Sequence, residues 1–324
     1  MLFTKKRNFG VTQRDFLNEA VLGYVNLCKV RTDVGYAASD ATSIDKSKKI
    51  ALKKCYSEYL ERYSLGIKVG SEECTEVIEY TRKQIGNNYL SAFAYGDHAT
   101  GHNDTTGTAA GLYSDFIINK AICELVEKNE VFCFWYGSKG NVVEQTAEVK
   151  KIINKLGFIS TDFFCFCLQE ISNYPTILVL GFLNQRLITT GVSCTNNILS
   201  SLQNAFQEAK IVEWQQFQNP ESNFSSFSDD DHRTFWDKIV QKHNSLPKYN
   251  YESQMHSHII FAEWVNNIQI RLIHEDRRLG VKVIKCISEE LLSCLPIKKN
   301  IEYSLNKEIV KRYYLDKEVD CPIV

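Results

Sequence analysis

One nine-residue pattern occurs twice in the sequence, at residues 54–62 and 120–128. Each copy has a Lys, a Glu four residues later, two apolar residues, a second Glu and a basic residue. Residues three and four apart share one face of an α-helix. Each copy therefore predicts a helix that presents two carboxylates and the Lys on one side and its apolar pair to the core. A chain with two such helices has to bury one face of each and leave the other accessible.

The paired carboxylates are the strongest candidates for a functional site. Hard cations such as Mg²⁺ prefer oxygen ligands and bridge to phosphate oxygens. On two packed helices, four carboxylates could hold such a cation jointly: Glu58, Glu61, Glu124 and Glu127. The alternative is a pair of solvated helix faces, because a Glu near a Lys often only stabilises its own helix. The spacing alone leaves both interpretations open.

Long helical segments alternate with segments of strand character. Apolar residues recur with helical periodicity over residues 50–64, 115–135, 144–156 and 197–216. Runs rich in Ile, Val, Phe and Thr predict strands at residues 158–168, 176–182, 185–190 and 281–287. Residues 308–314 also look helical. We therefore predict an α+β (mixed α/β) fold.

Two polar segments have weaker signals. The interval at residues 217–231 contains Asn, Ser, Pro and three successive aspartates, which predicts an exposed loop, with a metal site at the aspartates as the alternative. His98 and His102 have the spacing of zinc ligands on one helical turn, but Gly101 between them favours a loop.

Composition limits the class of protein. The 324 residues carry 38 basic and 39 acidic side chains, a net charge of −1, which argues against a nucleic-acid partner bound by long-range attraction. No segment has the roughly 18 apolar residues of a membrane helix, and no apolar run follows the first charges, so we expect neither a membrane partner nor export. The eleven cysteines should then be reduced thiols in a cytoplasmic protein. Cys165 and Cys167 lie in a run that predicts a buried strand, and metal binding there is the alternative.

The common phosphate-binding motifs do not occur in the sequence. It has neither a G-x-x-x-x-G-K-[ST] loop nor a G-x-G-x-x-G after a strand, and it also lacks a G-x-S-x-G nucleophile turn. A nucleotide, if one binds, would need another kind of site.

The repeated motif and its surroundings resemble the YcaO family, ATP-dependent enzymes that modify backbone amides of ribosomally made peptides. The E-x-x-E-R-[YFL]-S signature of the family is similar to residues 58–64. Its G-x-A-A-G turn and following E-x-x-E-[RK] helix resemble residues 107–111 and 124–128. A third segment, a strand with a Gly and then a helix ending in E-x-x-Q, resembles residues 190–193 and 205–208. The resemblance covers residues 40–290.

This resemblance implies a single YcaO-like domain with β-sheets packed by long helices that carry the paired E-x-x-E motifs. We expect an N-terminal segment at residues 1–40, the ATP-binding domain at 41–295 and a C-terminal helix and tail at 296–324. The implied cofactors are ATP and Mg²⁺, with the four glutamates as metal ligands. The implied nucleotide-binding residues are Arg62, Ala109, Gly111, Lys120, Lys128 and Glu208.

The implied activity is the conversion of Cys, Ser or Thr in a precursor peptide to an azoline, as in thiopeptide and microcin-type pathways. The implied partners are the precursor peptide, a separate E1-like or ThiF-like protein that binds its leader, and a flavin dehydrogenase acting afterwards. Relatives often end in a Pro-rich tail whose carboxylate approaches the reacting centre, which makes Val324 the candidate proton acceptor. A frayed end is the alternative for this tail.

Some positions depart from the family pattern. Leu112, Phe116 and Lys120 stand where Asn, Glu and Gln or His are common. Counting from Glu208 puts Ile211 at the Gln position of the third segment, whereas a shift of five residues offers Glu213 and Gln216. Two other functions therefore stay open: thioamide or amidine formation by the same site, and a non-catalytic subunit with an altered nucleotide pocket.

Overall fold

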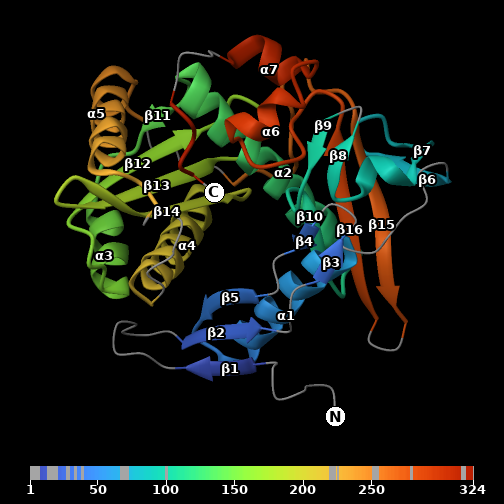
Figure 1. The fold of residues 1–324 in the computed structure, drawn as a ribbon, viewed down its shortest axis with the longest axis horizontal. Coiled ribbons are helices and arrows are strands. Elements are labelled where there is room, and N and C mark those ends of the chain that lie inside the picture. Colours follow the sequence, from blue (N-terminus) through green and yellow to red (C-terminus); the bar gives the residue numbers. More distant parts are fainter. Residues whose placement is uncertain are drawn as a thin grey trace. The chain divides into compact units, whose positions relative to one another are not determined.

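The computed structural model describes most of the chain. The described residues are 8–12, 21–26, 30–32, 35–37, 40–65, 73–98, 101–218, 224, 226–249, 255–277, 280–314 and 319–323. They divide into two compact units (Figure 1). Unit 1 is built mainly from Val21–Asn129 and Phe261–Tyr314, and unit 2 mainly from Glu130–Ile260 with the C-terminal residues. The expected boundaries after residues 40 and 295 do not coincide with these limits and stay predictions.

Unit 1 has two antiparallel sheets and the first motif helix. The three-stranded sheet has the order β1-β2-β5, and the five-stranded sheet has the order β10-β16-β15-β6-β7. Their strands are β1 (Asn8–Thr12), β2 (Val21–Asn26), β5 (Asp40–Asp45), β6 (Cys74–Glu79), β7 (Gln84–Tyr89), β10 (Thr108–Gly111), β15 (Ile268–Asp276) and β16 (Val281–Ser288). Two hairpins add β3 (Val30–Thr32) with β4 (Gly35–Ala37) and β8 (Gly96–His98) with β9 (Gly101–Asn103). The helices are α1 (Lys48–Leu65), α6 (Lys298–Glu302), α7 (Glu308–Tyr313) and a 3₁₀ turn at Leu90–Phe93.

Helix α1 contacts both sheets of unit 1, through β2 and β5 on the small sheet and through β10 on the large one. A side chain at Gly23 of β2 would come within 3.0 Å of the Ala51 backbone, so the absence of one lets helix and strand approach closely. Cys55 and Tyr59 of α1 pack on Val25 and Ala41. These contacts bury one face of α1 and leave Glu61 on the side of β10.

Unit 2 is a four-stranded antiparallel sheet with helices on both faces. Its strands, in the order β11-β12-β13-β14, are β11 (Asn141–Val142), β12 (Asp162–Leu168), β13 (Thr176–Leu183) and β14 (Arg186–Cys194). Its helices are α3 (Ala147–Leu156), α4 (Ile198–Gln218) and α5 (Asp229–Ser245), and α2 (Ser114–Gly137) passes from unit 1 into unit 2. Helix α3 ends at Gly157, whose φ of 60° is the left-handed conformation that a C-cap needs.

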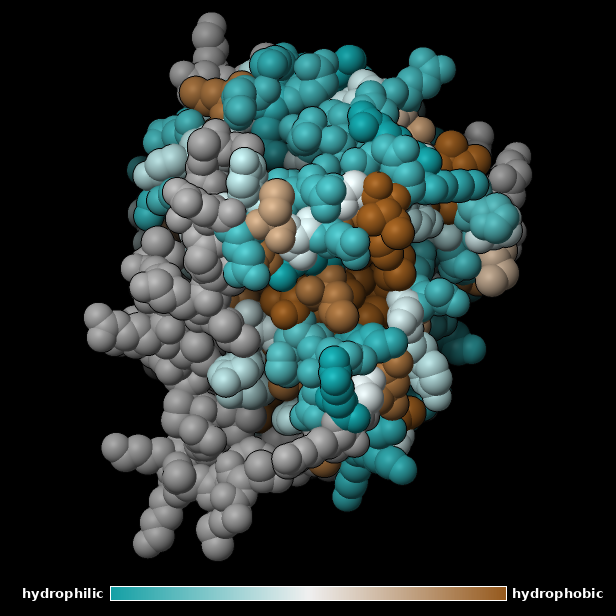
Figure 2. Space-filling model, turned by 90° about the vertical axis from the view of Figure 1, so that its right-hand side faces the viewer, coloured by the Kyte–Doolittle hydropathy of each residue, from teal (hydrophilic) through white to brown (hydrophobic). Residues whose placement is uncertain are grey.

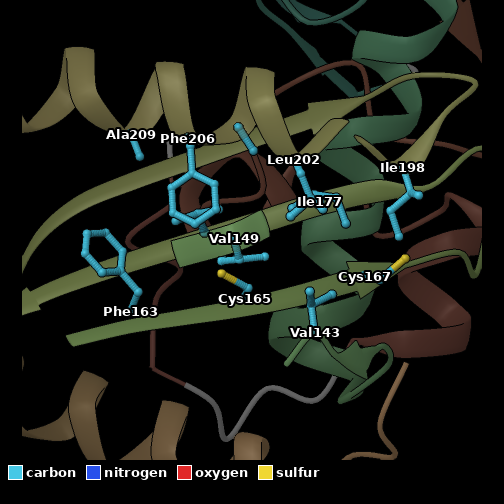
Figure 3. Close-up of a cluster of buried hydrophobic side chains, with 12 residues drawn as sticks. Val143, Val149, Phe163, Cys165, Cys167, Ile177, Ile198, Leu202, Phe206 and Ala209 are labelled. Atoms are coloured by element: carbon cyan, nitrogen blue, oxygen red, sulfur yellow. The ribbon is translucent and has the colours of Figure 1, made fainter. Parts of the chain in front are cut away.

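The core of unit 2 follows from the alternation of side chains along β12. Phe163, Cys165 and Cys167 point to one face, where Phe206 and Ala209 of α4 pack on them (Figure 3). The intervening Phe164 and Phe166 contact rings of α5 and α2 on the other face. Because both faces are covered, β12 reads as a continuous apolar run. The predicted buried strand with core thiols is confirmed, since Cys165 and Cys167 are at most 2% exposed.

Some sequence predictions need correction. Asp229, Asp230 and Asp231 are not in a loop but form the first turn of α5, where Ser228 and Asp231 make a capping box. Carboxylates stabilise the N-terminal end of a helix through its dipole, which explains a run of three without a ligand. The G-x-A-A-G segment is a turn only at Gly107, whose φ is 76°, and continues as strand β10.

The surface of unit 1 carries exposed apolar residues on its large sheet. Ile78 of β6 and Ile85 of β7 are cross-strand partners and are 48% and 75% exposed. Figure 2 is a view of the side on which Figure 1 draws β6 and β7. On this side hydrophobic residues gather among hydrophilic ones. In the described part of the chain, no helix is both long and apolar enough to cross a membrane. The ten cysteines described there are free thiols.

Candidate functional site

The two copies of the repeated motif meet at Glu61, the second glutamate of α1. Its Oε1 atom accepts a hydrogen bond from the Lys120 ammonium of α2 at 2.7 Å and another from the backbone N–H of Ala110 at 2.8 Å. Glu61 is 6% exposed. One buried carboxylate oxygen therefore joins helix α1, strand β10 and helix α2, all within unit 1.

Small residues allow this approach. Ala109 and Ala110 of β10 are at most 3% exposed, and β10 pairs with β16 in the register Ala109 to Ile284. A Cβ at Gly111 would stand 2.7 Å from the Ile117 side chain, so the Gly lets α2 start close to the end of β10. The predicted nucleotide residues Ala109 and Gly111 thus lie on the strand that supplies the amide to Glu61.

Two further glutamates of the motifs have basic neighbours. The Glu58 carboxylate accepts from the Arg62 guanidinium at 2.6 Å, one turn along α1. The Glu127 carboxylate lies 3.3 Å from the Lys128 ammonium, and both side chains are 13% exposed. Four of the predicted site residues therefore form two ion pairs within their own helices.

Glu124 is the fourth glutamate, and it differs from the others. It accepts no hydrogen bond from any residue that the structure describes. Burial raises the pKa of its carboxyl well above the usual range, and the neighbouring Glu61 charge raises it further, against the opposing effect of Lys120. Burial lowers the pKa of Lys120, but the charges of Glu61 and Glu124 outweigh that effect and raise it. These shifts put Glu61, Lys120 and Glu124 in one electrostatic group.

The group can accept a cation. The group consists of the four motif carboxylates with Arg62, Lys120 and Lys128, and the buried Lys285 ammonium also interacts with Glu124. No three His, Cys, Asp or Glu side chains of the described residues are grouped as ligands of one metal ion. Mg²⁺ in nucleotide sites is usually held by one or two carboxylates, with water and phosphate oxygens as its other ligands. The hard oxygen donors and the unpartnered Glu124 fit that requirement.

The two lysines of the repeated motif do not have the same role. Lys54 lies on α1 at the position that Lys120 has on α2, and the repeat predicted that both would share a face with their glutamates. The Lys54 ammonium instead lies 3.0 Å from Asp45, at the end of β5, with half of the side chain exposed. The strand that precedes α1 offers a nearer carboxylate, so the likeness in sequence does not extend to the ion pairs.

The third family-like segment lies in unit 2. Glu208 of α4 accepts a hydrogen bond from the Val192 N–H of β14 at 2.8 Å, so the predicted strand and helix do meet. At Gly191, a Cβ would stand 2.0 Å from the Ala205 backbone oxygen, which requires a Gly there. The role of Glu208 toward a nucleotide stays a prediction.

Glu213, the alternative to Glu208, is fully used by the fold. Its carboxylate accepts from the Lys210 ammonium at 2.7 Å and from the backbone N–H groups of Ile159 and Ser160. The side chains of Lys210 and Glu213 are each 1% exposed. A carboxylate bound to so many donors has no accessible atoms for a ligand, which favours Glu208 as the equivalent residue.

The described C-terminal residues, 319–323, pack against α2 in unit 2. Cys321 and Ile323 are at most 4% exposed, and the Trp135 ring N–H of α2 donates to the Val319 carbonyl at 2.8 Å. The Tyr136 hydroxyl also bonds the Asp320 carboxylate at 3.1 Å. The alternative of a frayed end is wrong for these residues. Val324, the predicted proton acceptor, lies outside the described residues.

Sequence reasoning missed Ala110 and Lys285. Ala110 contributes a backbone amide, which no side-chain pattern reveals. Lys285 of β16 is fully buried, and its ammonium donates to the Asp104 carbonyl at 2.7 Å and to the Thr106 carbonyl. It thereby fixes the turn before β10. A Lys between Ile284 and Cys286 was the available signal, because a buried charge needs such partners.

Solved structures show the same fold. No protein-family model and no curated protein matches the sequence significantly. The chain is similar to a subunit of the E. coli microcin synthetase McbBCD complex with pro-MccB17 bound, at 13% identity and a TM-score of 0.70, over 98% of this chain and 96% of that one. It is also similar to YcaO from Methanopyrus kandleri bound with AMPPCP and Mg²⁺, at 10% identity and a TM-score of 0.65, over 90% and 87%.

A third similar structure is a heterocyclase in complex with substrate and cofactor, at 13% identity and a TM-score of 0.60. The likeness covers 88% of this chain and 50% of that one, so the chain spans half the length of that protein. These likenesses confirm the predicted mixed α/β fold and its similarity to YcaO proteins over most of the chain.

Proposed function

We propose that this chain, which has the YcaO fold, is an ATP-dependent cyclodehydratase that forms azolines in a ribosomally made peptide. The observation that carries the proposal is the hydrogen-bonded group of Glu61, Ala110 and Lys120. Each residue belongs to a different part of the family-like motifs: the first E-x-x-E, the G-x-A-A-G segment and the second E-x-x-E helix. A shared fold alone does not imply a shared function, so this arrangement is the more specific argument.

The chemistry requires an activated amide oxygen. The side chain of a substrate Cys, Ser or Thr attacks the preceding amide carbon, and the amide oxygen must then depart. Bound ATP would supply the phosphoryl group that makes that oxygen a leaving group. The protein then has mainly to position the reactants and neutralise charge. No nucleophile from the protein is needed, which agrees with cysteines whose thiols are mostly buried.

The motif residues would have different roles in binding the metal ion and the nucleotide. Glu58, Glu61, Glu124 and Glu127 would hold Mg²⁺ through their carboxylates, with Glu124 as the ligand that the fold leaves unpartnered. Arg62 and Lys128 would contact phosphate oxygens, since each is within one turn of a proposed metal ligand and carries a positive charge. Ala109 and Gly111 of unit 1 would line the nucleotide.

We also propose that the chain acts with other proteins. Two of the similar structures are complexes of a microcin synthetase, one of them with its precursor bound. By analogy, a separate leader-binding protein would present the precursor peptide to this chain, and a flavin dehydrogenase would act on the azoline afterwards. Val324 would place its carboxylate as proton acceptor. Adding one Gly after Val324 moves that carboxylate while keeping the buried residues, and should lower cyclisation but not ATP binding.

A non-catalytic subunit is the second candidate. The observation in its favour is the start of α2, where Leu112 and Phe116 are 49% and 66% exposed at positions that the family fills with polar residues. Exposed apolar side chains of this size are typical of protein-binding surfaces. A binding subunit would keep the fold and release no phosphate in response to a precursor.

One experiment separates these functions. The purified chain is mixed with ATP, Mg²⁺, the precursor peptide encoded beside it and the leader-binding partner, while phosphate release and peptide mass are followed. We expect phosphate release that depends on the precursor, with loss of one water per ring. A precursor whose Cys, Ser and Thr residues are replaced by Ala is the control and should release none. Oxygen-to-sulfur exchange would instead identify thioamide formation, and release of no phosphate would support the binding subunit.

A further inference from the structure

Lys120 occupies a place in the carboxylate group where a divalent cation would otherwise be expected. Its ammonium is 2.7 Å from Oε1 of Glu61, and the Ala110 N–H is 2.8 Å from the same atom. A carboxylate oxygen has two lone pairs, and here both are used by donors. This oxygen therefore has no lone pair left for a metal ion, and only the second oxygen of Glu61, Oε2, remains for one.

The repeat itself provides an internal comparison. Lys54 and Lys120 have the same position relative to their glutamates, but only Lys120 binds a glutamate of the other helix. Lys54 pairs with Asp45, which is not part of the carboxylate group. The position of Lys120 is therefore not a simple result of the motif spacing. It is a contact between α1 and α2 that brings a positive charge next to Glu61 and Glu124.

We propose that Lys120 is a fixed cation of this site, which holds Glu61 against β10 and takes the place of one divalent cation. This inference rests on the proposed function, since it concerns the cations of the same nucleotide site. It differs from the family resemblance, which implied that Lys120 contacts the nucleotide. Of the four glutamates proposed above as metal ligands, Glu61 then contributes structure and charge, and the other three hold the divalent cation of the native chain.

The proposal predicts how cation binding responds to the removal of one charge. Lys120→Gln keeps a side chain of similar length that can still donate to Glu61, but it removes the positive charge. At a partly buried site the Lys120 charge repels a nearby divalent cation and neutralises part of the Glu61 charge, and both effects are strong over a few ångströms. We expect the variant to bind one more Mn²⁺ per chain than the wild type, or to bind Mn²⁺ about tenfold more tightly. Lys120→Arg keeps the charge and should behave as the wild type.

The measurement is a titration of each purified chain with Mn²⁺ followed by electron paramagnetic resonance, with and without a non-hydrolysable ATP analogue. Lys54→Gln is the matched control, because it removes the equivalent lysine from the first copy of the motif and should leave Mn²⁺ binding unchanged. Glu61→Gln tests the same pair from the other side: it frees the ammonium to approach Glu124, and should weaken Mn²⁺ binding about tenfold. Circular dichroism and thermal melting establish that each variant is folded.

The outcomes separate this inference from the proposed function. Wild-type binding of Mn²⁺ with the nucleotide analogue, together with identical binding by Lys120→Gln, would overturn the role of Lys120 and leave the proposed site intact. An equal change of Mn²⁺ binding in Lys54→Gln and Lys120→Gln would also overturn the role of Lys120 and leave the proposed site intact. If neither the wild type nor any variant binds Mn²⁺ in the presence of the analogue, both the proposed metal site and the role of Lys120 are wrong.

Discussion

Units 1 and 2 each contain a Lys–Glu pair at 2.7 Å, and the two pairs have different surroundings. In unit 2, Lys210 and Glu213 are each 1% exposed, and the Glu213 carboxylate also accepts from Ile159 and Ser160. In unit 1, the Lys120 side chain is 43% exposed, and its neighbour Glu124 has no hydrogen-bond donor among the described residues. The first pair is fully buried and hydrogen-bonded, whereas the second is partly exposed and adjoins a glutamate without a hydrogen-bond donor among the described residues.

The comparison shows which glutamates can be functional. A buried ion pair with all its partners belongs to the architecture, and removing one member leaves an uncompensated charge. A half-buried carboxylate with a raised pKa and no hydrogen-bond donor costs stability, and such groups gather at sites that bind ligands. Unit 2 therefore uses its pair to attach α4 to the segment before β12. Unit 1 keeps one carboxylate available.

The largest expected effect is that of Glu124→Gln. We expect precursor-dependent phosphate release to fall about a thousandfold, since a ligand of the essential cation is lost. The melting temperature should stay equal or rise, because burial and the Glu61 charge disfavour the ionised carboxylate that the change removes. Phosphate release and thermal melting on the same preparation check both parts.

Glu148→Gln is the matched control for Glu124→Gln. Glu148 is an exposed residue in the first turn of α3, and its replacement should leave phosphate release unchanged. Wild-type turnover in Glu124→Gln would contradict the assignment of the site. So would an equal loss in Glu148→Gln.

Glu213→Gln should show the opposite behaviour. Breaking a fully buried pair from one side costs about 3–5 kcal/mol, because Lys210 is left as an unpaired buried charge. Urea denaturation should detect this loss, while turnover per folded molecule stays near the wild-type value. Adding Lys210→Met to Glu213→Gln should recover part of the lost stability. A stable Glu213→Gln variant with reduced turnover would mean that the two units do not differ as argued.

Glu130 lies where α2 enters unit 2. It is intermediate between Glu213 and Glu124, because it is buried and hydrogen-bonded but also has a raised pKa. It is 1% exposed and accepts from the Ile171 and Glu170 N–H groups, and burial raises its pKa from 4.5 to about 7. Between these values the unfolded chain has lost the proton that the folded chain keeps, so stability falls as the pH rises from about 4.5 to about 7. At about 1.4 kcal/mol per pKa unit, this amounts to about 3 kcal/mol.

The test for Glu130 is the pH dependence of unfolding. Glu130→Gln has no proton to lose, so its stability relative to the wild type should improve by about 3 kcal/mol between pH 4.5 and 7. Denaturation of both proteins at several pH values in that window gives the difference directly. Parallel stability curves would show that Glu130 stays ionised in the folded chain.

Much of the fold could be predicted because long apolar patterns determine it. The helices near residues 50–64, 115–135, 144–156 and 197–216 correspond to α1, α2, α3 and α4, and Gly157 ends α3 as expected. The strands at β12, β13, β14 and β16 were also expected. Periodicity did not predict β6, β7 or α5, because β6 and β7 leave apolar residues such as Ile78 and Ile85 exposed and α5 begins with a polar run. Their structure depends on pairing and capping with distant residues.

The site was predictable only in part. The repeated motif identified the glutamates, since helix spacing fixes which residues share a face. It did not show that Glu61 binds Ala110 and Lys120, because those contacts depend on how α1, α2 and β10 pack. Counting left Glu208 and Glu213 open as alternatives, and only the packing reveals that Glu213 is enclosed by its own partners.

Lys54→Gln should have the smallest effect, although Lys54 matches Lys120 in the repeat. Its ion pair with Asp45 has one side chain half exposed and the other 20% exposed, and exposed pairs contribute about 0–1 kcal/mol. A nearby hydrogen bond from Ser47 N–H also holds Asp45, so the strand–helix junction keeps one contact. We expect a stability loss below about 1 kcal/mol and unchanged turnover, measured by urea denaturation and phosphate release. A clear loss of turnover would mean that Lys54 also serves the site and that the two copies of the motif act alike. The difference between their ion pairs would then have no functional meaning.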